Sequence, residues 1–289
     1  MTGVQTCALP ISSEVVGKDL RTLCLEGPKE DLAQTVVTQP ALYVLSAMLT
    51  YDFERNGVQP VATAGHSAGE YAALLASGAW DFETGLQVIS TRARIMYQSG
   101  QLRPGGMAAV LGLDGEQVEA FCNETFPNKE VVVANLNAPN QTVISGQKES
   151  VEQSVGMLKE RGARRVLPLP VSGAFHSPLL EEGAREFADY LGSVQIVSPT
   201  IPWVSNRTAQ SESSPDVIRE HLAAQLISPV RWRECMEALD QSGCDMFLEI
   251  GPGKVLTGLA KGCGISKPCE PVGTPAEVES ILNEGVAES

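Results

Sequence analysis

One pentapeptide constrains the fold of this chain more than any other feature. Residues 65–69 read Gly-His-Ser-Ala-Gly, between the apolar run 58–64 (VQPVATA) and the small-residue run 70–76 (EYAALLA). The first run predicts a short buried strand, and the second predicts a helix suited to close packing on a sheet. Glycines on both sides of Ser67 allow a sharp turn between strand and helix. This succession predicts an α/β fold with a parallel sheet.

The same turn favours a catalytic role for Ser67. A serine between a strand and a helix projects its hydroxyl from the end of the strand, where it can act as a nucleophile. The helix that begins just after it directs amide N–H groups at negative charge that develops there. Because a Gly-x-Ser-x-Gly pattern also arises by chance, the interpretation depends on the flanking strand and helix.

Composition excludes several classes of protein. The 289 residues are 43% apolar and 19% charged, which allows one large domain or a domain with a smaller insertion. The net charge of −14 argues against a nucleic-acid partner. No run of about 18 apolar residues is present, so we expect no membrane span. The seven cysteines are irregularly spaced without a Cys-x-x-Cys pair, which indicates reduced thiols and a cytoplasmic location.

The order of predicted elements indicates a smaller unit inserted into a larger one. Between residues 102 and 172 the pattern reads strand, helix, two strands, helix and strand, with a turn sequence at 137–140 between the paired strands. This βαββαβ order predicts a ferredoxin-like subdomain. The flanking segments, 12–101 and 173–289, then form the larger α/β core. In that core Pro40 marks the start of a helix predicted over 41–55, where a missing N–H does no harm.

A serine nucleophile needs a base, and the chain has three histidines. His66 lies on the turn itself and is interpreted as scaffold, whereas His221 lies in a charged predicted helix and is expected to be solvated. His176 follows a predicted strand in a glycine-containing loop, where catalytic groups often collect. The alternative is that His176 only caps the next helix. Three separated histidines without paired ligand spacing predict no metal site.

Two arginines, Arg92 and Arg94, lie on a helix predicted over 81–99 with apolar neighbours. One interpretation is a solvated helix face. The other is that one guanidinium points into the serine cleft and holds a carboxylate through two parallel hydrogen bonds.

Together these motifs resemble the malonyl-CoA:acyl-carrier-protein transacylases of fatty-acid synthesis and the acyltransferase domains of polyketide synthases. The resemblance extends from about residue 14 to the C-terminus, and many motifs occur in the right order. They are 26–28 (EGP), 38–42 (TQPAL), 65–71 (GHSAGEY), 92–96 (RARIM), 135–146 (NLNAPNQTVISG), 173–177 (GAFHS), 228–232 (SPVRW) and 249–256 (EIGPGKVL). The family fold is a hydrolase-like core with an inserted ferredoxin-like subdomain.

The resemblance assigns roles by position. It implies that Ser67 is acylated, that His176 is its general base, and that the backbone carbonyl of Gln225 orients the imidazole. It also implies that the N–H of Ala68 is an oxyanion donor. For substrate binding, it implies that Arg92 pairs with the free carboxylate of malonyl and that Phe175 follows the malonyl-type pattern.

The implied reaction is malonyl transfer from malonyl-CoA to the phosphopantetheine thiol of acyl-carrier protein, through a malonyl-serine ester in a ping-pong scheme. The resemblance implies a monomeric enzyme that binds no cofactor of its own. Two alternatives stay open: a serine thioesterase or hydrolase, and a non-catalytic remnant or docking protein.

The first residues differ from the family pattern. Family members begin with a strand and a Gly-Gln-Gly-Ser-Gln loop, whose glutamine supplies a second oxyanion N–H, and this sequence contains neither. We interpret residues 1–11 (MTGVQTCALPI) as a non-native leader joined near Ser12 to a truncated reading frame, which would impair catalysis.

Overall fold

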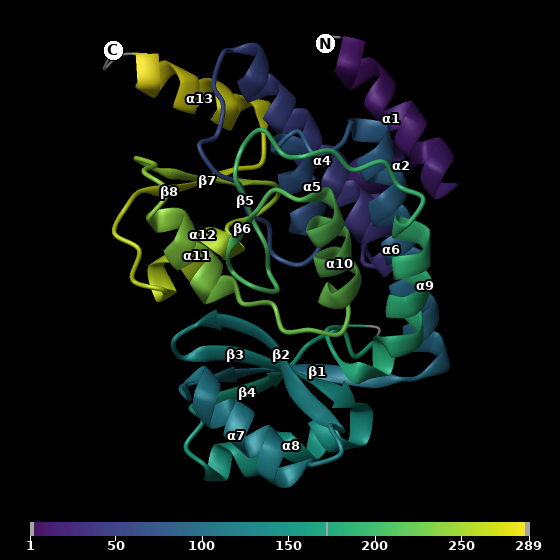
Figure 1. The fold of residues 1–289 in the computed structure, drawn as a ribbon, viewed down its shortest axis with the longest axis vertical. Coiled ribbons are helices and arrows are strands. Elements are labelled where there is room, and N and C mark those ends of the chain that lie inside the picture. Colours follow the sequence, from purple (N-terminus) through teal and green to yellow (C-terminus); the bar gives the residue numbers. More distant parts are fainter. Residues whose placement is uncertain (1–2, 172, 287–289) are drawn as a thin grey trace.

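The computed structural model describes residues 3–171 and 173–286 and shows two bodies (Figure 1). The smaller body contains one antiparallel sheet with two helices, and the larger body surrounds two short strand pairs with helices. Helices of the larger body are α1 (Gly3–Val16), α2 (Leu20–Glu26), α3 (Lys29–Leu32), α4 (Thr35–Arg55), α5 (Gly69–Ala76), α6 (Phe82–Leu102), α9 (Glu181–Leu191), α10 (Pro215–Gln225), α11 (Trp232–Asp240), α12 (Val255–Gly262) and α13 (Pro275–Val286).

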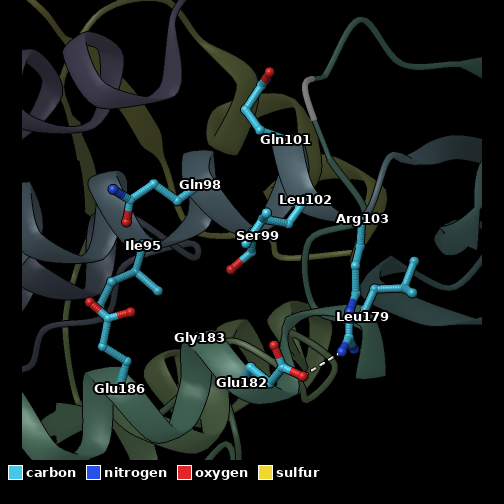
Figure 2. Close-up of a pocket in the computed structure, with 10 residues that line it drawn as sticks. All are labelled: Ile95, Gln98, Ser99, Gln101, Leu102, Arg103, Leu179, Glu182, Gly183 and Glu186. Carbon is cyan, nitrogen blue, oxygen red and sulfur yellow. Dashed lines mark hydrogen bonds and ion pairs between the residues drawn. The ribbon is translucent and has the colours of Figure 1, made fainter.

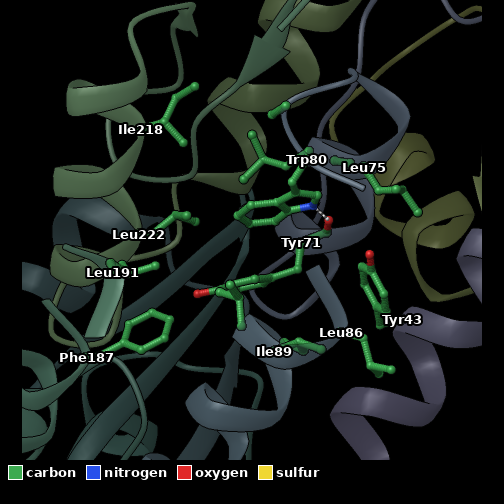
Figure 3. Close-up of a cluster of buried hydrophobic side chains, with 14 of the residues drawn as sticks. Tyr43, Tyr71, Leu75, Trp80, Leu86, Ile89, Phe187, Leu191, Ile218 and Leu222 are labelled. Carbon is green, nitrogen blue, oxygen red and sulfur yellow. Dashed lines mark hydrogen bonds between the residues drawn. The ribbon is translucent and has the colours of Figure 1, made fainter. Parts of the chain in front are cut away.

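The core of the larger body brings α5, α6, α9 and α10 together (Figure 3). Tyr71 of α5 stacks on Trp80, with ring centroids 6.0 Å apart, and Phe187 of α9 lies 6.4 Å from Tyr71. The indole Nε1 of Trp80 donates to the backbone oxygen of Tyr71 over 3.2 Å. This packing fixes the orientation of α5, which begins beside Ser67, and of α6, which carries Arg92.

Parallel strand pairs confirm the α/β class, but they are short. Strand β7 (Phe247–Ile250) pairs in parallel with β8 (Cys269–Val272), and Thr63 forms a parallel bridge to Trp203. Strand β5 (Trp203–Val204) also pairs with β6 (Ser211–Glu212) in antiparallel fashion. The strand predicted over 58–64 is therefore reduced to one bridged residue, because Thr63 alone in that run has a ladder partner among the described residues.

The smaller body has its own sheet and its own core. Its elements are β1 (Gly105–Leu111), α7 (Gly115–Thr125), β2 (Val131–Ala138), β3 (Gln141–Gln147), α8 (Lys148–Glu160) and β4 (Arg165–Pro168). The sheet order is β2-β3-β1-β4 with antiparallel neighbours. Phe121, Ile144 and Leu158 are buried together where the two helices meet the sheet. The predicted boundary residue 172 lies outside the described residues.

Two backbone hydrogen bonds join the bodies. The N–H of Leu136 in β2 donates to the oxygen of Val230 over 2.9 Å, and the N–H of Val230 donates to the oxygen of Ala134 over 2.9 Å. The edge strand of the smaller sheet is thus bonded to the segment that leads into α11. This joint places β2 beside the nucleophile turn.

One helix boundary differs from the sequence-based expectation. Helix α4 begins at Thr35, so Pro40 lies inside it rather than at its start. The first turn of the helix forms ahead of Pro40, where the oxygen of Gln34 accepts from the N–H groups of both Val37 and Thr38. After the His176 loop, a 3-10 turn, η1 (Pro178–Leu180), precedes α9.

At the N-terminus, residues 3–11 of the predicted leader belong to α1, and residues 1–2 lie outside the described part of the chain. Within residues 3–171 and 173–286, no helix is both long and apolar enough to cross a bilayer.

Candidate active site

The turn at residues 65–69 holds Ser67 in a strained conformation. Ser67 has a φ of 51°, in the left-handed region that L-residues rarely adopt. A Cβ on Gly65 would lie 2.0 Å from the backbone carbon and oxygen of Gly69, so the two backbone segments meet at a distance that excludes any side chain. The glycine before the serine is therefore a requirement of the turn.

His176 lies against the nucleophile. The Ser67 Oγ is 2.8 Å from Nε2 of His176, and Nδ1 of the same ring is 2.8 Å from the backbone oxygen of Gln225. Because a carbonyl can only accept, Nδ1 carries the proton and Nε2 accepts from the serine hydroxyl. The structure thus brings Ser67, His176 and Gln225 together, although the first and last of them are 158 positions apart in the sequence. The Gln225 carbonyl takes the place of the carboxylate that orients the histidine in many serine enzymes.

The surroundings keep the imidazole neutral. Burial, and after it the nearby positive charge of Arg92, lower the pKa of His176 to about 3. A neutral imidazole is the form that can take a proton from a hydroxyl. The backbone of His176 is also strained, with a φ of 58°.

Arg92 is fully buried, at 0% exposure, and faces the serine. Its Nη2 donates to Ser67 Oγ over 3.0 Å and to the side-chain oxygen of Gln225 over 2.7 Å, while Nη1 donates to Gln39 Oε1 over 2.7 Å. The guanidinium carbon lies 5.4 Å from the centroid of the Tyr71 ring, a cation–π contact. The solvated-face interpretation is therefore wrong for this residue.

Arg94, by contrast, lies on a solvated helix face. It is exposed and pairs with Glu186 of α9 over 3.0 Å. Helix periodicity separates the two arginines. Arg92 shares a face with Ile89 and Met96, three residues before and four after it, and both are buried.

Ala68 offers a free backbone donor. It precedes α5, and its N–H has no hydrogen-bond partner among the described residues, whereas the N–H of Ser67 donates to Asn206 Oδ1 over 2.8 Å. An amide at a helix N-terminus beside the nucleophile can stabilise an oxyanion. Phe175, the residue before His176, is half-buried and packs against the core clusters of both bodies.

Sequence reasoning missed three polar residues around the site, namely Asn206, Glu70 and Gln39. Asn206 donates through Nδ2 to the oxygen of Gly65 over 2.8 Å, and its own N–H donates to Glu70 Oε1 over 2.6 Å. Gln225 Nε2 donates to the oxygen of Ser67 over 3.1 Å and also to Glu70. Burial raises the pKa of Glu70 to about 8. The third is Gln39, which positions Arg92. The sequence offered one signal for these residues: Glu70 directly follows the pentapeptide at 65–69, which indicates a role near the turn.

The other two histidines have structural surroundings. His66 Nε2 lies 2.8 Å from Asn137 Oδ1 of β2, which fits its interpretation as scaffold. The expectation that His221 is solvated is wrong: it is buried on the inner face of α10, with Nδ1 3.0 Å from Ser205 Oγ. Within the described ranges, no group of three His, Cys, Asp or Glu side chains is arranged for a metal ion.

Two hollows differ in their relation to this site. The first, of about 440 Å³, lies between the end of α6 and α9 and is crossed by the Arg103–Glu182 ion pair (Figure 2). It contains none of the predicted site residues. The second is a groove of about 1,360 Å³ whose lining includes His66 and Ala68.

This geometry defines a serine acyl-transfer site: a hydroxyl on a strained turn, a neutral histidine, a free amide and a buried arginine. The chain belongs to the acyl transferase domain family, which matches residues 10–274. The malonyl CoA-acyl carrier protein transacylase of Escherichia coli (strain K12) is 39% identical over 251 residues, 86% of this chain and 81% of the relative. The polyketide biosynthesis malonyl CoA-acyl carrier protein transacylase of Bacillus subtilis (strain 168) is 41% identical over 250 residues, 86% and 85% of the two chains.

Solved structures show the same fold. An acyl carrier protein S-malonyltransferase from Vibrio cholerae superposes with a TM-score of 0.91 at 38% identity, covering 97% of this chain and 92% of that one. A type II polyketide malonyl-transacylase solved with its acyl-carrier protein has a TM-score of 0.92 at 35% identity, with 98% and 92% covered.

Proposed function

We propose that this chain transfers a malonyl group from malonyl-CoA to the phosphopantetheine thiol of acyl-carrier protein, in fatty-acid synthesis. The observation that carries the proposal is a pair of contacts to Ser67 Oγ. The Arg92 guanidinium donates a hydrogen bond to this oxygen, and Nε2 of the neutral His176 lies within hydrogen-bond distance of it. A buried cation at the nucleophile suits an acyl group that carries its own carboxylate. The names of the relatives specify the same substrate and carrier.

In the first half-reaction, Ser67 Oγ attacks the thioester carbonyl while His176 Nε2 takes its proton. The oxyanion that forms lies beside the Ala68 N–H. The carbon–sulfur bond then breaks, and the proton on Nε2 goes to the departing coenzyme A thiolate. The product is a malonyl ester on Ser67.

In the second half-reaction, the phosphopantetheine thiol enters the vacated site. It gives its proton to His176 Nε2, and its sulfur attacks the ester carbonyl. The ester bond breaks, Ser67 Oγ recovers the proton, and malonyl leaves as a thioester of the carrier. In both half-reactions, the backbone oxygen of Gln225 keeps the imidazole of His176 oriented.

Selectivity in this scheme comes from Arg92. An acyl group without a carboxylate would leave the buried guanidinium without an anionic partner, which is costly in free energy. Phe175 belongs to the same acyl pocket in the proposal, since it immediately precedes the base.

The division of the chain follows the same family pattern. We infer that 102–172 is the ferredoxin-like subdomain and that 12–101 and 173–289 form the hydrolase-like core; the observed order β2-β3-β1-β4 supports this. We also infer a monomeric enzyme with a cytoplasmic location, and the free thiols at Cys24, Cys122 and Cys235 support the location.

Labelling with radioactive malonyl-CoA tests the function. We expect one malonyl group per chain, stable to gel filtration and released when holo acyl-carrier protein is added. Ser67→Ala should abolish labelling, and Ser99→Ala on α6 is the matched control. Rapid loss of label to water without a carrier would instead identify a hydrolase.

A further inference from the structure

A short parallel ladder ends beside the nucleophile turn. Thr63 donates its N–H to the oxygen of Pro202 and accepts from the N–H of Val204, each over 2.8 Å, which is the bonding pattern of two parallel strands. Parallel ladders repeat this pattern at even spacing, every second residue along each strand. The turn at 65–69 therefore lies one and two steps beyond the last main-chain bonds of this ladder.

Asn206 makes the next two bonds of the ladder with its side chain. In a continued ladder, the main-chain N–H of Asn206 would donate to the oxygen of Gly65, and its main-chain oxygen would accept from the N–H of Ser67. Instead, Nδ2 of the side chain donates to the Gly65 oxygen, and Oδ1 accepts from the Ser67 N–H, both over 2.8 Å. A side-chain amide carries the same donor and acceptor as a peptide group, so it can replace one in the ladder.

The main chain of Asn206 is held by other partners. Its N–H donates to Glu70 Oε1 over 2.6 Å, and its oxygen accepts from the N–H of Arg231 over 3.0 Å. The residue is fully buried, at 0% exposure. Exchanging the side-chain nitrogen and oxygen would set donor against donor at Ser67 and acceptor against acceptor at Gly65. The amide therefore has one orientation.

This substitution of side chain for main chain suits a turn that leaves the strand direction. Ser67 has a φ of 51°, which no extended strand can contain. Such strained residues persist only where their surroundings fix them. The Asn206 side chain reaches beyond the end of β5 and bonds the peptide groups on both sides of His66, so it can fix the turn without requiring an extended backbone.

We propose that the side-chain amide of Asn206 is a positioning group for the nucleophile. It holds the Ser67 backbone in the left-handed conformation that directs Oγ at His176, and it acts only through that backbone. The inference rests on the part of the proposed function that makes Ser67 the nucleophile. It requires neither malonyl-CoA nor a carrier, so a reagent that needs only an activated serine can test it.

Diisopropyl fluorophosphate is such a reagent. Ser67 Oγ attacks the phosphorus, the phosphorus–fluorine bond breaks, fluoride leaves, and His176 takes the serine proton. Mass spectrometry follows the labelling. Asn206→Leu keeps the size of the side chain and removes both polar groups, so we expect the labelling rate constant to fall about 100-fold or more. Asn123→Leu on the exposed face of α7 is the matched control and should leave the rate unchanged.

Asn206→Asp separates positioning from a general effect on the fold. A protonated carboxyl group has one donor and one acceptor, like the amide, whereas a carboxylate only accepts and would oppose the oxygen of Gly65. Glu70 and Cys235 are the titratable groups hydrogen-bonded to Asn206 among the described residues. Burial and the neighbouring Glu70 carboxyl both favour the protonated form of the new group.

The Asn206→Asp variant should therefore recover in acid. Relative to wild type at the same pH, we expect labelling within about threefold at about pH 5 and at least about tenfold slower at about pH 8. Asn206→Leu should stay slow at both pH values. Circular dichroism and urea unfolding at each pH show that the compared chains are folded, and Asn206→Asp decides the question if Asn206→Leu does not fold.

Malonyl transfer gives a second measurement. We expect kcat to fall in the same order across the variants, with KM for malonyl-CoA within about twofold of wild type, because Arg92 is unaltered. If wild type reacts with the fluorophosphate in the expected pattern but does not transfer malonyl, the positioning role stands and the proposed function fails.

Three results would overturn the positioning role. The first is labelling of folded Asn206→Leu at the wild-type rate, and the second is a lack of acid recovery in folded Asn206→Asp. The third is unfolding of Asn206→Asp at about pH 5, where its protonated carboxyl group should replace the amide. That result would show that Asn206 supports the fold as a whole and not the nucleophile in particular.

Discussion

The guanidinium of Arg92 donates to Ser67 Oγ over 3.0 Å, and the same oxygen lies 2.8 Å from His176 Nε2. The serine oxygen is thus contacted by a fixed cation and by a neutral base at once. The contact with Arg92 opposes protonation of the imidazole and favours negative charge on the oxygen. It also places the cation within reach of an acyl group attached to that oxygen.

Replacing Arg92 should change acyl selectivity. In Arg92→Ala we expect kcat/KM for malonyl-CoA to fall about 10- to 150-fold, the loss typical of charge-assisted hydrogen bonds, with a smaller change for acetyl-CoA. Arg94→Ala, two residues away on the exposed face, should change neither. Steady-state transfer assays with both thioesters measure the ratio, and an unaltered malonyl preference in Arg92→Ala would exclude the assigned role.

The low pKa of His176 should extend activity into acid. With a pKa of about 3 the imidazole stays neutral at about pH 5, where only about 3% would be neutral at the ordinary value of about 6.5. We expect kcat/KM for acylation to stay level between about pH 5 and 7.5. A rate that falls tenfold for each pH unit below about 6.5 would show an unperturbed histidine.

The two glycines of the turn should respond oppositely to the same substitution. A Cβ on Gly65 meets the Gly69 backbone at 2.0 Å, whereas a Cβ on Gly69 meets nothing within 4 Å. We expect Gly65→Ala to destroy activity and to lower the free energy of unfolding by about 3 kcal/mol or more. Gly69→Ala should be neutral or stabilise α5 by up to about 1 kcal/mol. Urea unfolding compares them, and equal losses would contradict the turn geometry.

Glu70 should make stability depend on pH. Its folded pKa, about 8, lies above the ordinary value of 4.5, so the folded state retains a proton that the unfolded state releases. The free energy of unfolding should therefore fall as pH rises from about 4.5 to 8, with a slope of at most about 1.4 kcal/mol per pH unit.

Glu70→Gln cannot titrate at this position. Relative to this variant, the wild-type chain should be more stable at about pH 5 than at about pH 8. The exposed Glu279→Gln variant controls for general charge effects. Urea unfolding curves at several pH values measure the difference, and a constant offset between wild type and Glu70→Gln would show that the carboxyl titrates normally.

Local pattern was enough to predict the turn at Ser67 and the succession of strands and helices along the smaller body, because both depend on neighbours in sequence. It was not enough for Asn206, whose bonds to Gly65 and Ser67 connect residues about 140 positions apart. Many polar residues follow predicted strands in a sequence, and nothing local distinguishes Asn206 from the others. Only the folded chain shows which of them contacts the turn.

The strand predicted over 58–64 failed for a different reason. Its residues have the right apolar character, but a strand also needs partners on its edges, and only Thr63 finds one. Arg92 could have been assigned more firmly from spacing, since Ile89 and Met96 place it on the buried face of α6. For this residue, helix periodicity predicts burial correctly, whereas its charge alone predicts exposure.

The reciprocal hydrogen bonds between Val230 and β2 limit how substrates can enter. Separating the two bodies would break both bonds and expose their donors together, so wide hinge opening is disfavoured in each catalytic cycle. We therefore expect thioester substrates to reach Ser67 without a wide separation of the two bodies. An enzyme of this design would admit coenzyme A and a carrier arm in turn by the same entrance, with the smaller body acting as a stationary wall.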